Sequence, residues 1–207
     1  MAYALGIDLG TTFTAAAISR GDKPEMASLG GRSSSVPSVL WLGEDGQLLV
    51  GEVAERHAVT DPSRVVREFK RRVGDPTPLL VGGTPYSAET LMGRLLRWVV
   101  ETVTRTEGEA PGALVVAYPA NWGPYKRELL QQTIQIADLG NVQSIIEPVA
   151  ASLFYASTGK LADGDVVAVY DLGGGTFDAA ILRKTSSGFD VLGTPEGLER
   201  LGGIDFD

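Results

Sequence analysis

The feature that most constrains this chain of 207 residues is a turn that occurs twice. Residues 6–16 read GIDLGTTFTAA, and residues 169–180 read VYDLGGGTFDAA. Both copies consist of an apolar strand, Asp-Leu-Gly, small residues, Phe and a small apolar return strand, and the second turn is longer by a residue. An internal repeat of such a unit predicts a fold built from two related halves.

The residue types in these turns favour phosphate binding. Glycine lets the backbone approach a ligand closely and adopt positive φ. Successive backbone N–H groups in such a turn form a concavity that binds anions. Asp8 and Asp171 end the two strands, and a carboxylate would repel phosphate. They suit Mg²⁺, which prefers hard oxygen ligands and keeps several waters.

The two turns could also have roles other than phosphate binding. A single Asp-Gly or Gly-Gly-Gly sequence is equally consistent with an ordinary hairpin turn, whereas two copies of the same pattern favour a shared site. A P-loop is excluded, because Gly159-Lys160 is followed by Leu161 and the full motif is absent. No Gly-x-Gly-x-x-Gly opens a helix, so a dinucleotide site is unsupported.

Composition narrows the class of partner and compartment. The net charge is −8, which argues against nucleic acid as a partner, and the absence of cysteine excludes disulfides and cysteine-bound zinc. The N-terminus lacks the pattern of a secretory signal, and every apolar stretch is interrupted before it reaches membrane-spanning length. A soluble, cytoplasmic protein with no membrane or nucleic-acid partner is expected.

Hydrophobic periodicity predicts hairpins first, then alternating strands and helices, then hairpins again. Strands are expected at 3–8, 13–19, 39–42, 48–50, 113–118, 144–146, 165–171, 177–184 and 189–194, and helices at 53–59, 87–107, 124–137 and 148–157. Ser87 is a suitable N-cap for the long helix. The pattern is typical of an α/β fold with a mixed sheet. Residues 38–86 are expected to form a small inserted subdomain.

The two turns resemble motifs of a known superfamily. Residues 6–12 and 171–178 resemble the two phosphate motifs of the actin, sugar-kinase and heat shock protein 70 superfamily. Further matches resemble the heat shock protein 70 (DnaK-like) chaperones: Phe69-Lys70-Arg71 with Val73-Gly74, Tyr118-Pro119-Ala120, residues 146–151 (IEPVAA) and residues 201–207 (LGGIDFD). They follow the family order over essentially the whole chain. Ile146 and the turn at residues 121–124 depart from the family pattern and suggest a divergent member.

The resemblance implies an actin-like ATPase (ribonuclease H-like) fold. We expect a lobe with a mixed five-stranded sheet and flanking helices, a small inserted subdomain and a truncated second lobe. The implied division is residues 1–37 and 87–170 for the lobe I core, 38–86 for the insertion and 171–207 for the start of lobe II. The family's ATP-binding domain continues past Asp207, so this chain alone is expected to bind ATP weakly and hydrolyse it poorly.

The resemblance also implies roles for particular residues. The implied catalytic residues are Lys70, Glu147, Asp171, Thr176 and Asp178. The implied nucleotide-binding residues are Gly10, Thr11, Thr12, Phe13, Gly173, Gly174, Gly175, Thr176, Gly202 and Gly203. Mg²⁺ would be held mostly through water by Asp8, Asp171 and Glu147, and Pro119 and Arg127 would relay nucleotide state. Without the resemblance, Lys70 would be read as part of a solvated basic face and Glu147 as an ordinary helix start.

The function that the resemblance implies is an ATP-binding and ATP-hydrolysing module of a DnaK-like chaperone, with ATP/ADP and Mg²⁺ as cofactors. The full-length protein would have unfolded peptide clients, a J-domain co-chaperone and a nucleotide-exchange factor as partners. The alternatives are a non-hydrolysing nucleotide-dependent scaffold module, or a sugar kinase or filament protein of the same fold. An unpaired sheet edge or apolar cleft also makes a dimer of this chain an expectation.

Overall fold

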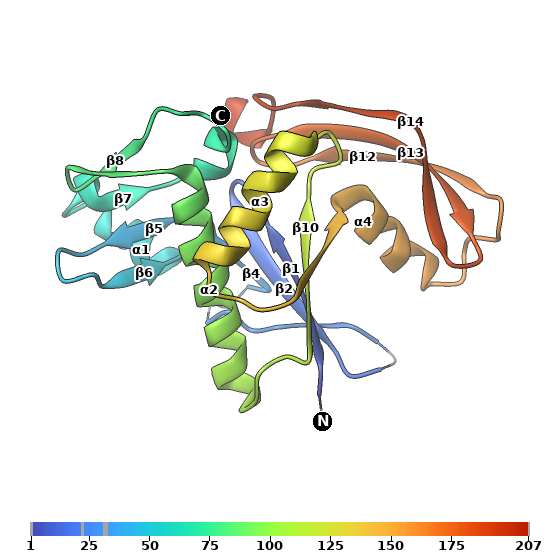
Figure 1. Cartoon of the computed structure of the whole chain (residues 1–207), viewed down its shortest axis with the longest axis horizontal. Coiled ribbons are helices and arrows are strands. Elements are labelled where there is room, and N and C mark those ends of the chain that lie inside the picture. The colour runs from blue at the N-terminus through green and yellow to red at the C-terminus, as the bar shows by residue number, and fades with distance from the viewer. Residues whose placement is uncertain (1, 22, 31–32, 207) are drawn as a thin grey trace.

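The computed structural model of the chain describes residues 2–21, 23–30 and 33–206. A mixed sheet forms its centre (Figure 1). The strand order is β11 (Val142–Ile146), β10 (Ala113–Tyr118), β1 (Ala4–Leu9), β2 (Phe13–Ser19) and β3 (Glu25–Met26), and β4 (Ser35–Pro37) also pairs with β2. β1 is parallel to β10 and antiparallel to β2, so the expected mixed sheet is confirmed.

The sheet has six strands among the described residues, not the expected five. The difference arises at the outer edge of β2, which is long enough to pair with two short strands. Its first half, from Phe13 to Ala15, pairs with β4, and Ala17 and Ile18 pair with β3. A strand of two or three residues carries too little pattern to be recognised in the sequence, because one alternation fits many loops equally well.

The alternation of side chains gives the sheet one well-covered face. Helices α2 (Ala88–Glu107) and α3 (Pro124–Ile136) pack there, and α2 buries Leu91, Leu95 and Val99 in the same apolar cluster as Leu5 of β1. The expected start of α2 is confirmed, since the Ser87 hydroxyl accepts a hydrogen bond from the Thr90 N–H at 3.2 Å. The helix therefore begins where the polar cap precedes the apolar stripe.

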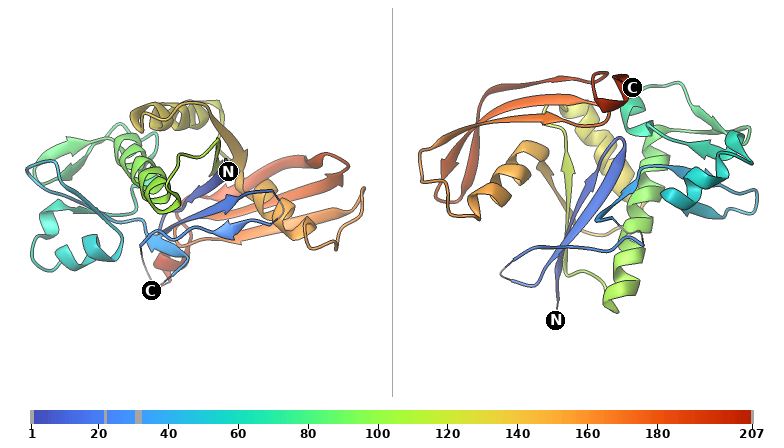
Figure 2. Two further views of the ribbon diagram at one scale, coloured as in Figure 1. Left: turned by 90° about the horizontal axis from the view of Figure 1, so that it is seen from below. Right: turned by 180° about the vertical axis from the view of Figure 1, so that it is seen from behind.

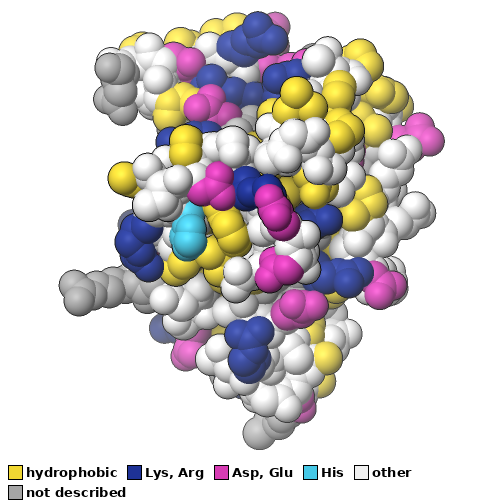
Figure 3. Space-filling view, turned by 90° about the vertical axis from the view of Figure 1, so that its left-hand side faces the viewer, with side chains coloured by type: hydrophobic (Ala, Val, Ile, Leu, Met, Phe, Trp, Pro, Cys, Tyr) yellow, Lys and Arg dark blue, Asp and Glu magenta, His cyan; other side chains and the backbone are white. Residues whose placement is uncertain are grey.

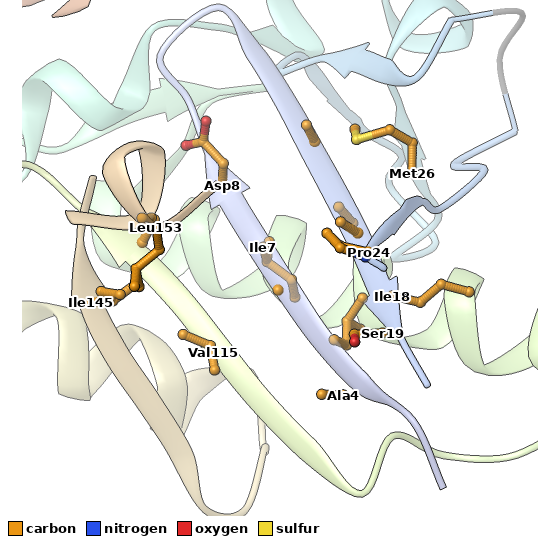
Figure 4. A pocket seen from close by; sticks show the side chains of 17 residues that line it. Ala4, Ile7, Asp8, Ile18, Ser19, Pro24, Met26, Val115, Ile145 and Leu153 are labelled. Atoms are coloured by element: carbon orange, nitrogen blue, oxygen red, sulfur yellow. The ribbon is translucent and has the colours of Figure 1, made fainter. Parts of the chain in front are cut away.

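The opposite face of the sheet is lined by small residues and is open. Helix α4 (Glu147–Ala156) lies over one side of this face. A cavity of about 600 Å³ lies there. Figure 4 shows Val115 and Ile145 on the strands and Leu153 on α4 among its lining residues. Asp8 lies at the end of this face, where β1 leads into the first turn.

Residues between β4 and α2 form a smaller unit beside the central sheet. Its elements are β5 (Leu40–Leu42), β6 (Leu48–Val50), α1 (Glu52–His57), η1 (Pro62–Arg64), β7 (Val65–Val66), η2 (Phe69–Arg72), β8 (Leu79–Val81) and β9 (Thr84–Tyr86). Leu40 and Phe69 belong to the buried cluster of the central lobe, so the unit shares that core. On its outer face, acidic and basic side chains are interspersed (Figure 3).

The last part of the chain forms a separate antiparallel sheet. Its order is β12 (Val166–Leu172), β13 (Phe177–Thr185) and β14 (Gly188–Leu198), followed by η3 (Gly203–Asp205). A domain division at residue 171 would cut β12, although its residues from Val166 to Leu172 pair with β13. We therefore propose a boundary before Val166. In the described part of the chain, no helix combines the length and apolar character needed to cross a membrane.

Candidate functional site

The two related turns meet at one cavity. Figures 1 and 2 show the β1–β2 turn directed towards the β12–β13 turn and the C-terminal end. The cavity has a volume of about 200 Å³ and is lined by Asp8, Gly10, Thr11, Thr12, Phe13, Lys70, Glu147, Asp171, Gly173, Gly174, Gly175 and Thr176. The structure therefore brings together most of the site residues that the sequence predicts, from segments far apart in the chain.

The glycines of the turns are needed for space. A Cβ added at Gly174 would overlap the side chain of Thr12, and one added at Gly175 would overlap that of Thr11. Gly10 faces the carbonyl of Phe13 in the same way. The expectation that these glycines adopt positive φ is wrong, because none of them is among the residues with positive φ. Contact between the two turns excludes a side chain at Gly174 and Gly175, whereas the backbone of its own turn excludes one at Gly10.

Gly202 and Gly203 lie behind the second turn and do not line the cavity. The N–H of Gly203 donates to the Gly173 carbonyl at 2.9 Å, and the N–H of Ile204 donates to the Gly174 carbonyl at 3.0 Å. A Cβ at Gly202 would overlap the backbone of the turn. The second glycine pair therefore supports the turn from the side away from the cavity.

Lys70 and Glu147 form an ion pair at the cavity wall. The Lys70 Nζ lies 2.8 Å from the Glu147 Oε1, and the side chains are only 10% and 13% exposed. Lys70 comes from η2, and Glu147 opens α4. Lys70 is thus not part of a solvated basic face, whereas its neighbour Arg72 pairs with Asp75 at 2.8 Å.

The two aspartates of the cavity have raised pKa values. The side chain of Asp8 opens to the cleft, but desolvation by the surrounding protein raises its pKa, and Lys70 partly opposes this. Desolvation and then the charge of Glu147 raise the pKa of Asp171. The charge of Asp171 also contributes to the raised pKa of Asp8. The acids therefore disfavour each other's charged forms, and a cation between them would relieve the repulsion.

Asp178 lies behind the cavity wall, directly across the β12–β13 pair from Asp171. It is buried, and its Oδ1 has no hydrogen-bond partner among the described residues. Desolvation, followed by the charge of Glu147, raises the pKa of Asp178 to about 6, although a hydrogen bond with Thr176 acts in the opposite direction. The group can therefore change its charge near neutral pH.

The two residues expected to act as a relay lie outside the cavity. Pro119 is buried at the end of β10 and borders a space of about 20 Å³ that also touches Lys70, Asn121 and Thr176. Arg127 is exposed on α3 and lines neither this space nor the cavity. Proximity thus connects Pro119, but not Arg127, to the residues of the site.

Sequence reasoning missed Ser38, which supports the first turn. The buried Ser38 hydroxyl donates to the Gly10 carbonyl at 2.8 Å and lies 2.9 Å from the Thr14 hydroxyl. Its N–H donates to the Thr12 carbonyl at 2.8 Å. Ser38 belongs to no motif, so only the tertiary contact reveals it.

The acids of the cavity are oxygen donors from separate elements of the chain. Within the described ranges, no group of three or more His, Cys, Asp and Glu side chains is arranged to hold an ion directly. Asp8, Asp171 and Glu147 line one cavity, and the charge of Glu147 contributes to the raised pKa of both aspartates. Mg²⁺ in phosphate sites is commonly bound through one or two carboxylates and retained waters, and carboxylates that share a cavity are ligands of this kind.

The structure combines an α/β lobe with a separate antiparallel sheet. One of the two related turns lies in each, and both turns border one cleft. This arrangement defines a class of two-lobed proteins with duplicated turns. A family model described as Hsp70 protein matches residues 4–78 and 77–207. Chaperone protein DnaK of Cenarchaeum symbiosum (strain A) is 36% identical over 213 residues, which cover 100% of this chain and 32% of that protein. The chain belongs to the Hsp70 family, and this family implies the actin-like ATPase fold. It spans about a third of the length of that curated relative.

Proposed function

We propose that this chain is an ATP-binding and ATP-hydrolysing module of a DnaK-like chaperone. The observation that carries the proposal is the single cavity shared by both turns, the acids and Lys70. The chain has a net charge of −8, so it needs local hydrogen-bond donors to bind a polyanion. The backbone N–H groups of the turns supply these donors. Membership of the Hsp70 family supports the same assignment.

The turns would hold the phosphates. Thr11, Thr12 and the stretch from Gly173 to Thr176 present backbone and hydroxyl donors to the β- and γ-phosphates. Asp8, Asp171 and Glu147 would hold Mg²⁺ through its waters, and the ion would neutralise phosphate charge when bound. The raised pKa values of Asp8 and Asp171 support this part of the proposal, since acids that repel each other favour a cation.

Lys70 would stabilise charge that develops on the γ-phosphate and orient the attacking water. Its ion pair with Glu147 keeps the ammonium group at the cavity wall. Thr176 and Asp178 would take part in proton handling, because a carboxyl group with a pKa of about 6 can both accept and release a proton near pH 7. Positioning and electrostatics, with no covalent intermediate, would carry the reaction.

In a longer protein that contains it, the module would couple ATP hydrolysis to the binding of unfolded peptides. A J-domain co-chaperone and a nucleotide-exchange factor would then act on it. The similarity to Chaperone protein DnaK of Cenarchaeum symbiosum supports this role.

The proposal is tested by nucleotide binding with this chain and by single-turnover hydrolysis with a longer protein that contains it. Binding of ATP that requires Mg²⁺, together with hydrolysis that Lys70→Ala abolishes, is the expected result. Arg72→Ala is the matched control, because Arg72 pairs with Asp75 and does not line the cavity. ATP binding without hydrolysis would favour a non-hydrolysing module, and the absence of any response to ATP would refute the assignment.

A further inference from the structure

We propose that Arg71 is a positioning residue that holds the second turn in its phosphate-binding form. This inference rests on the proposed function and assigns a role to a residue outside the cavity. Arg71 does not line the cavity between the turns, so it acts through the turn and not on the ligand directly.

Each of the three nitrogens of the Arg71 guanidinium group donates a hydrogen bond. Its Nε donates to the Gly175 carbonyl at 3.0 Å, its Nη1 donates to the Asp205 Oδ1 at 3.1 Å, and its Nη2 donates to the Asp205 Oδ2 at 2.5 Å. The side chain is only 13% exposed. The planar guanidinium has the geometry for a bidentate carboxylate contact together with a further acceptor.

Asp205 is itself fixed to the segment behind the turn. Its Oδ2 also accepts the N–H of Gly202 at 2.8 Å. The hydrogen bonds from Arg71, then the one from the Gly202 N–H and the charge of Arg71, hold the pKa of this carboxyl below its ordinary value. Arg71 thus connects the inserted unit, the second turn and the chain around Gly202 in one contact.

This connection completes a pattern on the outer side of the turn. Three successive carbonyls accept hydrogen bonds from outside: Gly173 from the Gly203 N–H, Gly174 from the Ile204 N–H, and Gly175 from Arg71. In a planar trans peptide, the carbonyl of one residue and the N–H of the next point in opposite directions. Drawing the carbonyls outward therefore turns the N–H groups of residues 174–176 towards the cavity.

Those N–H groups are available for an anion. None of them donates a hydrogen bond to another residue in the described part of the chain. Two of the carbonyls are held by backbone donors, whereas the Gly175 carbonyl depends on a side chain. Arg71 is thus the point at which a single substitution can loosen the turn without changing its glycines.

Amide NMR titration tests this role with Mg²⁺-pyrophosphate, Mg²⁺-ATP and adenosine as probes. Arg71→Ala is expected to weaken pyrophosphate and ATP binding about tenfold, the effect of a lost hydrogen bond to a charged group. Any response to adenosine should not change, because it carries no phosphate. Arg71→Lys should not restore binding, since an ammonium group cannot reproduce the fork. Arg72→Ala is the matched control, because Arg72 contacts Asp75 and Thr77.

A second measurement needs no ligand. Hydrogen exchange at the amides of Gly203 and Ile204 reports whether the turn carbonyls stay in place. Exchange is expected to accelerate about tenfold in Arg71→Ala but not in Arg72→Ala. Asp205→Asn keeps an oxygen acceptor and should give an intermediate effect, which guards against a variant of Arg71 that fails to fold.

The outcomes separate the two proposals. Equal phosphate binding by wild type and Arg71→Ala would overturn the role of Arg71 while leaving the proposed function intact. Unchanged exchange at Gly203 and Ile204 in Arg71→Ala would overturn it as well. A wild-type chain that responds to no phosphate probe would instead overturn the proposed function, and the role of Arg71 in phosphate binding would fall with it.

Discussion

Lys70 and Glu147 are separated by 77 positions in the chain, yet the Nζ of one lies 2.8 Å from the Oε1 of the other. The pair joins the inserted unit, through η2, to the first turn of α4. Both side chains are largely buried at 10% and 13% exposure. The position of the catalytic lysine proposed here is therefore set by an acid on a different structural unit.

Removing only Lys70 should lower the free energy of unfolding more than removing the charges of both Lys70 and Glu147. Lys70→Met leaves the carboxylate of Glu147 buried without its partner, and we expect a loss of about 3 kcal/mol in unfolding free energy. Lys70→Met with Glu147→Gln should recover much of that loss. Urea denaturation of the four proteins in a double-mutant cycle measures the difference.

The control for this cycle is an exposed pair. Asp163→Ala removes the partner of Lys184, and the side chain of Asp163 is 61% exposed. We expect it to cost less than about 1 kcal/mol. Equal costs for Asp163→Ala and Lys70→Met would show that burial of the Lys70–Glu147 pair is energetically unimportant.

Asp178 should make stability depend on pH. Its pKa is raised from 3.8 to about 6, so the folded chain holds this proton more tightly than the unfolded chain does. The resulting contribution is fully present below about pH 4 and is lost as pH rises through about 6, and it amounts to about 3 kcal/mol. Asp178→Asn should remove it. Unfolding free energies of both proteins from pH 4 to pH 8 measure this, and a constant difference would contradict the prediction.

The contact between the two turns should not tolerate a methyl group. Gly174→Ala places a Cβ against the side chain of Thr12, and we expect a loss of about 1 to 3 kcal/mol together with weaker phosphate binding. Gly140→Ala is the control, because a Cβ there meets no atom within 4 Å and its φ is not positive. Thermal unfolding and phosphate titration of both variants would test the prediction, and equal behaviour would argue against tight packing of the turns.

Ser38 should matter to the first turn although it belongs to no motif. Ser38→Ala leaves the Gly10 carbonyl without its hydroxyl donor, and we expect a cost of about 1 to 3 kcal/mol. Ser33→Ala is a matched control, because the Ser33 side chain is exposed and its hydroxyl accepts a long hydrogen bond of 3.4 Å from the neighbouring Ser35 N–H. Denaturant unfolding distinguishes the two, and a neutral Ser38→Ala would show that the turn keeps its form without this support.

Local structure was largely predictable. The long helix begins after Ser87, as its cap and apolar stripe predict, and β2 and β10 have the expected bounds. Such elements can be recognised in the sequence because the same hydrophobic periodicity repeats over many residues. The short strands β3 and β4 were missed because they lack that repetition, and β14 extends beyond the expected 189–194 to Leu198.

The sequence by itself determined the repeated turns and the α/β class, since these depend on residue type and local spacing. The resemblance to a known family supplied the remaining cavity residues Lys70 and Glu147. Only the tertiary structure decided that glycine is needed because the turns pack against each other, that Gly202 and Gly203 lie behind the turn, and that Arg71 and Ser38 support it. The physical reason is distance along the chain. Hydrogen bonds and excluded volume act between atoms that folding brings together, and no local pattern records which remote residue supplies the partner.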